Sequence, residues 1–416
     1  MNKSKAYPTK YYIRFITYVF MEVFIKYFKI KKQLPKEVED LDAPYLLLCN
    51  HVGFWDPFIV GHFLPRFTHF VSSDAAFRNP FLRFFLIRLG AIPKRKNIRD
   101  TKVIRDIVTV VRQGKNVGVF PEAVRNWSGK SFPMDSSIVK LIKMLKVPVV
   151  VGVLQGMNLF NPRWSTKKRR TQVNVLYTLM LSSQEVNELS EEDIYTRLND
   201  TLVHDEVDYQ RLHMNPVYSK HKAEGIGHAL YVCPQCNSID SFSSKRNSFW
   251  CNQCNYSLSI DVFGFYELVS GKNLYFDNIR DWYDWQETWM LKYITDKIED
   301  KYDEVIFEDL KSKIYHSEED NVIKYVGDGD VKLFIDRIEI DFINEQKNIV
   351  LNFNELQTIN PQLHERLEIF YNHEAYRIVG GKKGVSALKW EVAVNAIWQK
   401  MGLDNKRSIY IKQVVK

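Results

Sequence analysis

The run YLLLCNHVGFWDP, residues 45–57, decides the fold. Its first five residues are apolar and resemble a strand that is buried on both faces of a sheet. A histidine and a turn with a glycine follow at once, and Pro57 favours the start of a helix because proline suits the first helical turn. A buried strand that ends in such a turn is typical of α/β sheets, which place functional residues at the strand ends.

The same alternation continues along the next 120 residues and predicts the fold class. The segments expected to form strands are 45–49, 68–71, 116–120, 147–154 and 173–178. Those expected to form helices are 57–64, 80–89, 101–112 and 136–145. Strands separated by helices predict an α/β layered fold with a mostly parallel sheet.

The end of the chain has a different pattern. Predicted strands follow one another there without helices, at 331–334, 338–342, 348–353, 367–371 and 374–379. One helix, 386–401, is expected to close them into a small β-rich module. We therefore divide the chain into an interfacial helix (1–32), an α/β domain (33–231), a cysteine unit (232–258) and an acidic β-rich module (259–416).

Charge is distributed unevenly along the chain, which has 58 basic and 50 acidic residues in total. Residues 1–32 hold eight basic residues and one acidic, and residues 78–105 hold nine and one. Residues 267–348 hold 11 basic and 21 acidic residues. The N-terminal half is thus suited to an anionic surface, either a bilayer or a nucleic acid, and the acidic segment is not.

The arrangement of residues 11–30 favours the bilayer. On a helical wheel the polar and charged residues occupy about half of the circumference, and aromatic or aliphatic side chains fill the other half. Charges interrupt any stretch approaching the ~20 apolar residues that a crossing needs, so we expect a helix lying in the membrane interface. The alternative is a helix that packs on the protein's own core with its charged face in water.

A secretory signal peptide is not expected at the N-terminus. Glu22 and Lys26 interrupt the apolar region, and no small-residue cleavage site follows. The expected location is therefore the cytoplasm, with the protein bound peripherally to the inner face of the membrane.

His51 and Asp56 form the first candidate catalytic pair. Residues five apart on a regular helix lie ~140° apart around its axis, so the two side chains meet only if the chain turns between them. With a helix beginning at Pro57, Asp56 is expected at the N-cap, where one oxygen accepts a helix N–H and the other orients the imidazole. Such a pair can remove a proton from a hydroxyl. On spacing alone this match is weak, and a simple cap with a structural strand-end histidine is the favoured interpretation.

Three later segments, in a fixed order, extend this pattern. Residues 90–96 read GAIPKRK, a short strand ending in Lys94, Arg95 and Lys96. Residues 120–125 read FPEAVR and place Glu122 three residues before Arg125. Residues 147–150 read VPVV and open another buried strand.

Together these four blocks resemble the glycerolipid acyltransferase family typified by 1-acylglycerol-3-phosphate acyltransferases. The resemblance covers about residues 40–180. It implies transfer of a fatty acyl group from acyl-CoA or acyl carrier protein to a hydroxyl of a glycerol-phosphate-type lipid such as a lysophospholipid. It further implies His51 as general base, Asp56 as its partner, and Glu122 and Arg125 as acceptor-site residues. This chemistry requires no catalytic metal.

Two positions depart from the family pattern. Ala123 and Val124 stand where the family has glycine and commonly a small hydroxyl residue, which narrows or redirects the expected acceptor pocket. Lys96 falls where the family has an arginine, and a lysine binds phosphate without the bidentate fork. Phosphate recognition is expected from Lys94, Arg95, Lys96 and Arg125 without a decision among them, and a solvated basic turn is the alternative for the first three.

Four cysteines form a separate unit. Cys233 and Cys236 make one Cys-x2-Cys pair, and Cys251 and Cys254 make a second. Two such pairs suit a structural zinc ion in a ribbon, with every coordination position filled by sulfur. Two disulfides are the rival, but nothing in the chain points to an oxidising compartment.

Two other functions remain open at this stage. A zinc ribbon can bind nucleic acid or act as a scaffold, but between its cysteine pairs this unit holds only Lys245 and Arg246 beside Asp240, so we expect no nucleic-acid partner. A non-catalytic lipid sensor or tether is the other alternative, with the C-terminal module as binding element. That module loosely resembles pleckstrin-homology domains, although its acidity argues against phosphoinositide binding.

Overall fold

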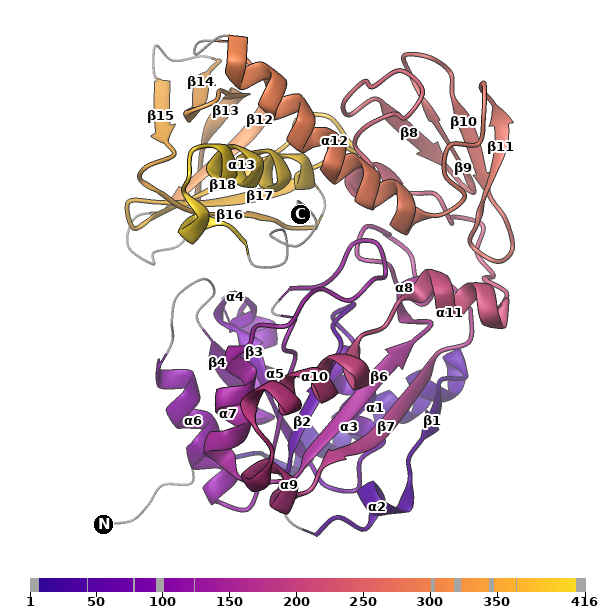
Figure 1. Ribbon diagram of the computed structural model, residues 1–416, viewed down its shortest axis with the longest axis vertical. Coiled ribbons are helices and arrows are strands. Elements are labelled where there is room, and N and C mark those ends of the chain that lie inside the picture. Colours follow the sequence, from indigo (N-terminus) through magenta and orange to yellow (C-terminus); the bar gives the residue numbers. More distant parts are fainter. Residues whose placement is uncertain are drawn as a thin grey trace. The chain divides into compact units, whose positions relative to one another are not determined.

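The computed structural model describes residues 7–42, 44–77, 79–94, 101–122, 124–300, 304–317, 323–343, 348–363 and 365–408. The chain forms two compact units (Figure 1). Unit 1 comprises residues 1–162 and 169–217, and unit 2 comprises residues 163–168 and 218–416.

Unit 1 is an α/β layer structure built on a seven-stranded sheet of order β1-β7-β6-β2-β5-β3-β4. Its strands are β1 (Lys31–Gln33), β2 (Leu46–Cys49), β3 (Thr68–Ser73), β4 (Ile92–Lys94), β5 (Asn116–Val119), β6 (Val149–Gln155) and β7 (Asn174–Leu181). All neighbours are parallel except β6 and β7. The prediction of an α/β fold with a mostly parallel sheet is confirmed.

Helices cover both faces of this sheet. They are α1 (Tyr11–Phe28), α2 (Lys36–Glu39), α3 (Asp56–His62), α4 (Asp74–Phe77), α5 (Pro80–Arg88), α6 (Thr101–Arg112), α7 (Ser137–Leu145), α8 (Met157–Phe160), α9 (Ser183–Glu188), α10 (Glu191–Leu202) and α11 (Glu206–His213). The central strand β2 explains the layering, because its side chains alternate between two cores. Leu46 and Leu48 pack with α6, α7 and α10, whereas Leu47 and Cys49 pack with α1, α2 and α3.

Unit 2 is mostly β-structure. A four-stranded antiparallel sheet consists of β8 (Phe242–Lys245), β9 (Ser248–Cys251), β10 (Ser257–Ile260) and β11 (Tyr266–Ser270). A seven-stranded antiparallel sheet consists of β12 (Phe307–Ser317), β13 (Lys324–Leu333), β14 (Arg337–Phe342), β15 (Asn348–Asn352), β16 (Leu356–Pro361), β17 (Arg366–Tyr371) and β18 (Glu374–Val379). Two long helices, α12 (Ile279–Asp300) and α13 (Leu388–Lys400), accompany the sheets. The predicted β-rich C-terminal module is confirmed.

A buried ion cluster joins the parts of unit 2. The ammonium group of Lys389, on α13, contacts the carboxylates of both Asp240 and Asp309. The indole N–H of Trp390 donates to Asp309 over 2.7 Å. Because Asp240 lies between the two cysteine pairs and Asp309 lies on β12, this cluster connects the cysteine unit to the larger sheet. Removing one partner of such a cluster leaves an uncompensated buried charge, which costs roughly 3–5 kcal/mol.

Helix α1 presents an unusually apolar outer face. Ile13, Met21 and Ile25 are buried against unit 1. The large apolar residues that remain exposed are Tyr11, Tyr12, Phe15, Ile16, Tyr18, Val19, Phe20, Val23 and Tyr27. Among the described residues, no helix has the combination of length and apolarity that would let it cross a membrane.

Candidate active site

The turn after β2 is fixed to the neighbouring strand by Asn50. The side chain of this residue accepts a hydrogen bond from the N–H of Leu154 over 2.7 Å and donates one to the carbonyl of the same residue over 3.0 Å. Leu154 belongs to β6, which pairs with β2 in parallel. The two bonds therefore hold the start of the turn, and with it His51, at the carboxyl end of the central strands.

His51 meets Asp56 across this turn. The imidazole Nδ1 lies 2.9 Å from Oδ2 of Asp56, which also accepts hydrogen bonds from the N–H groups of Val52 (2.6 Å) and Gly53 (2.8 Å). A carboxylate oxygen beside Nδ1 requires the proton on that nitrogen, which leaves Nε2 unprotonated in the neutral ring. This geometry can supply a general base at Nε2.

The predicted N-cap position of Asp56 is wrong. Asp56 is the first residue of α3, and Trp55 stands at the N-cap without a side-chain hydrogen bond. The carboxylate of Asp56 points back into the turn instead of toward the helix, because the N–H groups of the turn compete for the same oxygen. Asp56 is fully buried, so water does not compete for these contacts, which fix the orientation of the imidazole.

Glu122, which follows β5 in the chain, holds the same turn through hydrogen bonds. One carboxyl oxygen accepts the backbone N–H of His51 over 3.0 Å, and the other accepts the N–H of Phe132 over 3.2 Å. Burial raises the pKa of Glu122 to about 8, against the opposing effect of these hydrogen bonds. Glu122 is not among the described residues that line the cavity beside His51. The family resemblance implies an acceptor-site role for Glu122, and in the structure its carboxyl group holds the backbone at His51 and Phe132.

An apolar cavity of about 580 Å³ opens beside His51 in unit 1. Its walls come from α1, the turn before α3, α3 itself, β3 and α5. Most of the lining is aliphatic or aromatic, and His51 and Arg125 are two of its polar members. The imidazole is 23% exposed and stacks on Phe120 with ring centroids 4.4 Å apart. The cavity can therefore hold an apolar chain beside the base.

Arg125 supplies positive charge in the wall of this cavity. Burial lowers the pKa of its guanidinium, and the nearby Asp56 carboxylate opposes that shift. The ordinary value for arginine is so high that the group stays charged at physiological pH. A half-buried guanidinium beside an apolar cavity is suited to bind a phosphate or carboxylate in the bidentate manner.

Of the other residues predicted to bind the acceptor, Lys94 is among the described residues. Lys94 ends β4 and is exposed, and it is not among the described lining residues. Arg95, Lys96 and Ala123 lie outside the described residues.

Sequence reasoning missed the walls of the cavity. Residues as distant in the chain as Thr17 on α1 and Leu89 after α5 line it together. Helix α1 is held to α3 by His62, whose Nε2 lies 2.9 Å from a carboxyl oxygen of Glu22. The apolar periodicity of these segments signals burial or exposure, but it does not say which faces meet.

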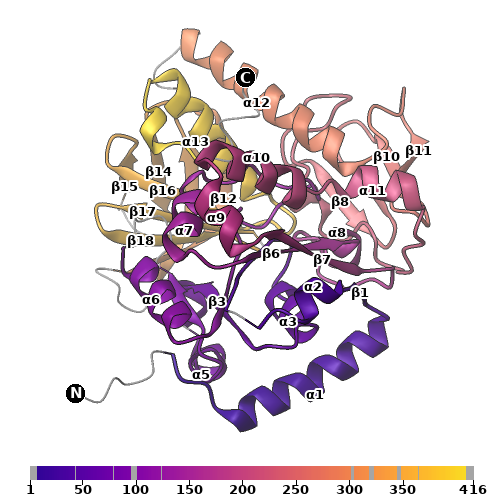
Figure 2. The same cartoon turned by 60° about the horizontal axis from the view of Figure 1, so that its bottom comes forward.

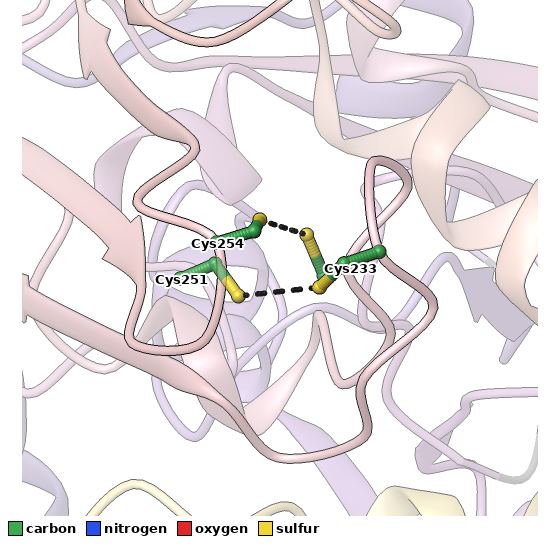
Figure 3. Close-up of side chains that lie close together, drawn as sticks. Cys233, Cys251 and Cys254 are labelled. Atoms are coloured by element: carbon green, nitrogen blue, oxygen red, sulfur yellow. Dashed lines mark hydrogen bonds between the residues drawn. The ribbon is translucent and has the colours of Figure 1, made fainter.

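The four cysteines of unit 2 come together (Figure 3). Their sulfur atoms all lie within 4.8 Å of one another, and the Cys233–Cys254 and Cys236–Cys251 pairs are both 3.7 Å apart. Figure 3 shows Cys233 facing Cys251 and Cys254 from a separate loop. A tetrahedral zinc site with Zn–S bonds of ~2.3 Å has sulfur atoms about 3.8 Å apart, so this donor set fits zinc.

The two cysteine pairs have the same backbone geometry. The residue after each pair, Asn237 or Asn255, has a left-handed backbone with φ of 59° or 58°. Its N–H donates to the carbonyl of the first cysteine of its pair, over 2.8 Å at Asn237 and 3.0 Å at Asn255. Two equivalent turns thus present four thiols to one centre, as a metal site requires.

Comparison with known proteins agrees with the resemblance found in the sequence. Residues 27–154 match the family model described as Acyltransferase. A 1-acyl-sn-glycerol-3-phosphate acyltransferase of Bacillus subtilis is 26% identical over 29% of this chain and 60% of its own length. One from Borreliella burgdorferi is 25% identical over 28% of this chain and 47% of its own length. The chain therefore spans about half the length of these curated relatives.

Among solved structures, the 1-acyl-sn-glycerophosphate (LPA) acyltransferase PlsC from Thermotoga maritima is similar to 47% of this chain. The match covers 78% of that chain at 14% identity, with a TM-score of 0.41.

Proposed function

We propose that the protein is an O-acyltransferase of the glycerolipid type, because residues 27–154 match the Acyltransferase family model and the chain is similar to 1-acyl-sn-glycerol-3-phosphate acyltransferases. It moves a fatty acyl group from an acyl thioester to a hydroxyl of a glycerol-phosphate-type lipid, with a lysophosphatidic acid-like acceptor. The observation that carries the proposal is the His51–Asp56 contact of 2.9 Å beside an apolar cavity that His51 lines.

In the proposed reaction His51 is the general base. Its Nε2 takes the proton of the acceptor hydroxyl while the hydroxyl oxygen attacks the thioester carbonyl carbon. Collapse of the tetrahedral intermediate breaks the carbon–sulfur bond, and the proton passes from His51 to the departing thiolate. Asp56 holds the imidazole in the required tautomer and stabilises its charged form.

The other site residues divide between the two ends of the substrate. Arg125 is proposed to bind the phosphate of the acceptor, because this half-buried residue lines the same cavity as His51. Lys94, Arg95 and Lys96 are proposed to add positive charge around this group. The apolar length of the cavity is suited to a fatty acyl chain, which arrives as acyl-CoA or on acyl carrier protein.

The test is a transfer assay with purified protein and vesicles. Labelled acyl-CoA is supplied with a panel of lysolipids, and the products are identified by mass. His51→Ala should lose ~10²–10⁴-fold in rate, since a positioned base contributes that much. Equal rates in wild type and variant would refute the base assignment. A wild type that binds lysolipid without turnover would favour the lipid sensor or tether.

We further propose that Cys233, Cys236, Cys251 and Cys254 hold one structural zinc ion in a ribbon. The sulfur spacing and the two equivalent Asn-terminated turns support this. With four thiolate ligands the ion has no open position for substrate. Its proposed role is to stabilise the fold of unit 2.

We propose that the protein binds peripherally to an anionic membrane, on the inner, cytoplasmic face. Support comes from the exposed apolar face of α1 and from the basic residues in the N-terminal half of the chain. Because α1 also lines the cavity beside His51, docking of this helix brings the base to the lipid surface.

A further inference from the structure

Helix α5 is apolar but buries none of its side chains. Six of its nine residues are Phe, Leu or Ile, yet no residue between Pro80 and Arg88 is buried. The helix is well formed, because the side chain of Asn79 caps it by accepting the N–H groups of Phe81 (3.0 Å) and Leu82 (3.1 Å). An apolar helix in a water-soluble unit ordinarily buries one face in its own core, so this helix needs another explanation.

The two sides of α5 face different surroundings. Leu86 and the following Leu89 line the cavity that contains His51. Phe81, Phe84 and Ile87 recur every third residue on the other side, with exposed fractions of 69%, 43% and 50%. The helix therefore forms a thin wall between the cavity and the outside, and its outer side is a separate apolar surface.

This outer side lies beside α1. The N–H of Lys10, just before α1, donates to the carbonyl of Arg88 at the end of α5 over 2.8 Å. Figure 2 shows α1 along the edge of unit 1, with α5 close to its N-terminal end. Both helices line the same cavity, and both carry exposed apolar residues.

Helix α5 and its immediate neighbours in the sequence carry positive charge. Arg83 and Arg88 lie on the helix, and residues 75–99 contain no Asp or Glu. The guanidinium of Arg88 sits over the ring of Phe84 at 3.6 Å from its centroid, which keeps cation and apolar surface together. A two-fold contact between copies of this chain would bring these cations against each other. An anionic bilayer offers complementary charge and an apolar interior together.

We propose that α5 is a second membrane-binding helix, which inserts Phe81, Phe84 and Ile87 into an anionic bilayer beside α1. The two helices together surround the opening of the cavity, so a lipid passes from the bilayer to His51 without crossing water. This inference relies on the proposed function only for the identity of the lipid. Binding itself is independent of acyl transfer.

The experiment uses the full chain with His51→Ala, so that no turnover occurs during binding. Vesicles of phosphatidylcholine with phosphatidylglycerol are sedimented with this protein and with a triple variant, Phe81→Ser, Phe84→Ser and Ile87→Ser. The matched control replaces three exposed apolar residues elsewhere in unit 1: Met144→Ser, Val203→Ser and Leu212→Ser. The α5 variant should bind the vesicles at least about tenfold more weakly. Burial of one large apolar side chain in the bilayer changes the affinity by a factor of about ten or more, and the variant loses three such side chains.

The control should bind as tightly as its parent. Amide hydrogen exchange in residues 80–88 of the unmodified chain should slow when vesicles are added, which tests the contact without any substitution. Equal binding by the α5 variant and unchanged exchange in these residues would overturn the proposal. So would a parent that sediments as a dimer in the absence of lipid while the variant is a monomer, since α5 would then bind a second copy.

The same variants separate this inference from the proposed function. In the background with His51 intact, the α5 variant should lose transfer to bilayer-embedded lysolipid and keep transfer to glycerol 3-phosphate in solution. If the parent transfers to neither acceptor but the binding results hold, the proposed function fails and the membrane-binding role of α5 stands.

Discussion

The buried carboxyl group of Glu122 accepts a hydrogen bond from the backbone N–H of His51 over 3.0 Å, while the His51 ring contacts Asp56. The base is thus positioned twice, through its main chain and through its side chain. Glutamine at position 122 retains one acceptor oxygen but places an amide N–H₂ group where the second acceptor was. Either His51 or Phe132 then loses its partner. We expect Glu122→Gln to lower kcat about tenfold or more while KM changes little, because Glu122 is not among the described residues that line the cavity.

A control at the same position distinguishes the charge from the contact. Glu122→Asp keeps both oxygens but shortens the side chain, so it should recover part of kcat if acceptance by Glu122 positions the turn. A large rise in the acceptor KM in Glu122→Gln, with kcat preserved, would instead return Glu122 to the acceptor site. Steady-state kinetics with separately varied donor and acceptor decide between the two.

Glu122 also predicts a dependence of stability on pH. Burial raises its pKa to about 8 in the folded protein, from an ordinary value of 4.5. The folded state therefore holds its proton more tightly than the unfolded state, and the stability this provides is present below about pH 4.5. It is lost as the pH rises toward 8, by a few kcal/mol at ~1.4 kcal/mol per pH unit. Urea unfolding at pH 5 and pH 8 should show the wild type losing more stability than Glu122→Gln between those values.

Arg125 and Lys94 differ in position, and this predicts different kinetic effects. Arg125 lines the cavity, whereas Lys94 is exposed at the end of β4. Arg125→Lys keeps the charge but loses the bidentate fork. We expect its KM for a phosphorylated acceptor to rise ~10- to 100-fold, since a charged hydrogen bond is worth ~1.5–3 kcal/mol. The KM for the thioester donor should stay constant, and Lys94→Met should have the smaller effect. A larger effect of Lys94→Met would indicate that the basic turn at residues 94–96 binds the phosphate.

The positions of β2 and of the His51 turn followed from the sequence because local rules determine them. A continuous apolar run indicates a strand buried on both faces, and five-residue spacing permits contact only across a turn. The direction of the Asp56 carboxylate did not follow, because spacing cannot say whether helix or turn N–H groups are the better donors. The actual donors are the N–H groups of Val52 and Gly53, which precede Asp56 in the chain, whereas the expected donors belong to the helix that follows it.

Long-range features were harder to predict. Glu122 is buried because β5 delivers it behind His51, 71 residues away in the chain, and no local pattern records that contact. Strand β12, Phe307–Ser317, was missed because alternating charges hide its apolar residues. The cysteine unit is the opposite case, since four sulfurs in two short pairs already specify one centre by their spacing.

Removal of the metal should affect more than the cysteine unit. Ser241 contacts the sulfur of Cys251 over 3.1 Å, and the preceding Asp240 joins the ion cluster around Lys389. Purified protein should hold one zinc ion per chain, and a chelator should unfold residues 233–254 and raise amide exchange in α13 as well. Exchange in unit 1 should change least. The matched control is Cys49→Ala, which leaves all four proposed ligands and should keep the zinc. Mass spectrometry that finds two disulfides in protein from the cytosol would exclude the site.

Helix α1 provides the last prediction, and its structure decides how the test is made. Deleting the helix would expose the core, because Met21 and Ile25 are buried beneath it. Substitutions on the outer face avoid this, so the variant is Ile16→Ser, Val19→Ser and Val23→Ser, all at exposed positions that are not among the described residues lining the cavity. We expect weaker binding to anionic vesicles and lower transfer to bilayer-embedded lysolipid, with transfer to a soluble acceptor retained. Raising the salt concentration should weaken wild-type binding without abolishing it, since ions screen charge and leave apolar burial intact. Vesicle binding that is the same in wild type and variant would mean that the outer face of α1 does not contact lipid, and the docking model would fail.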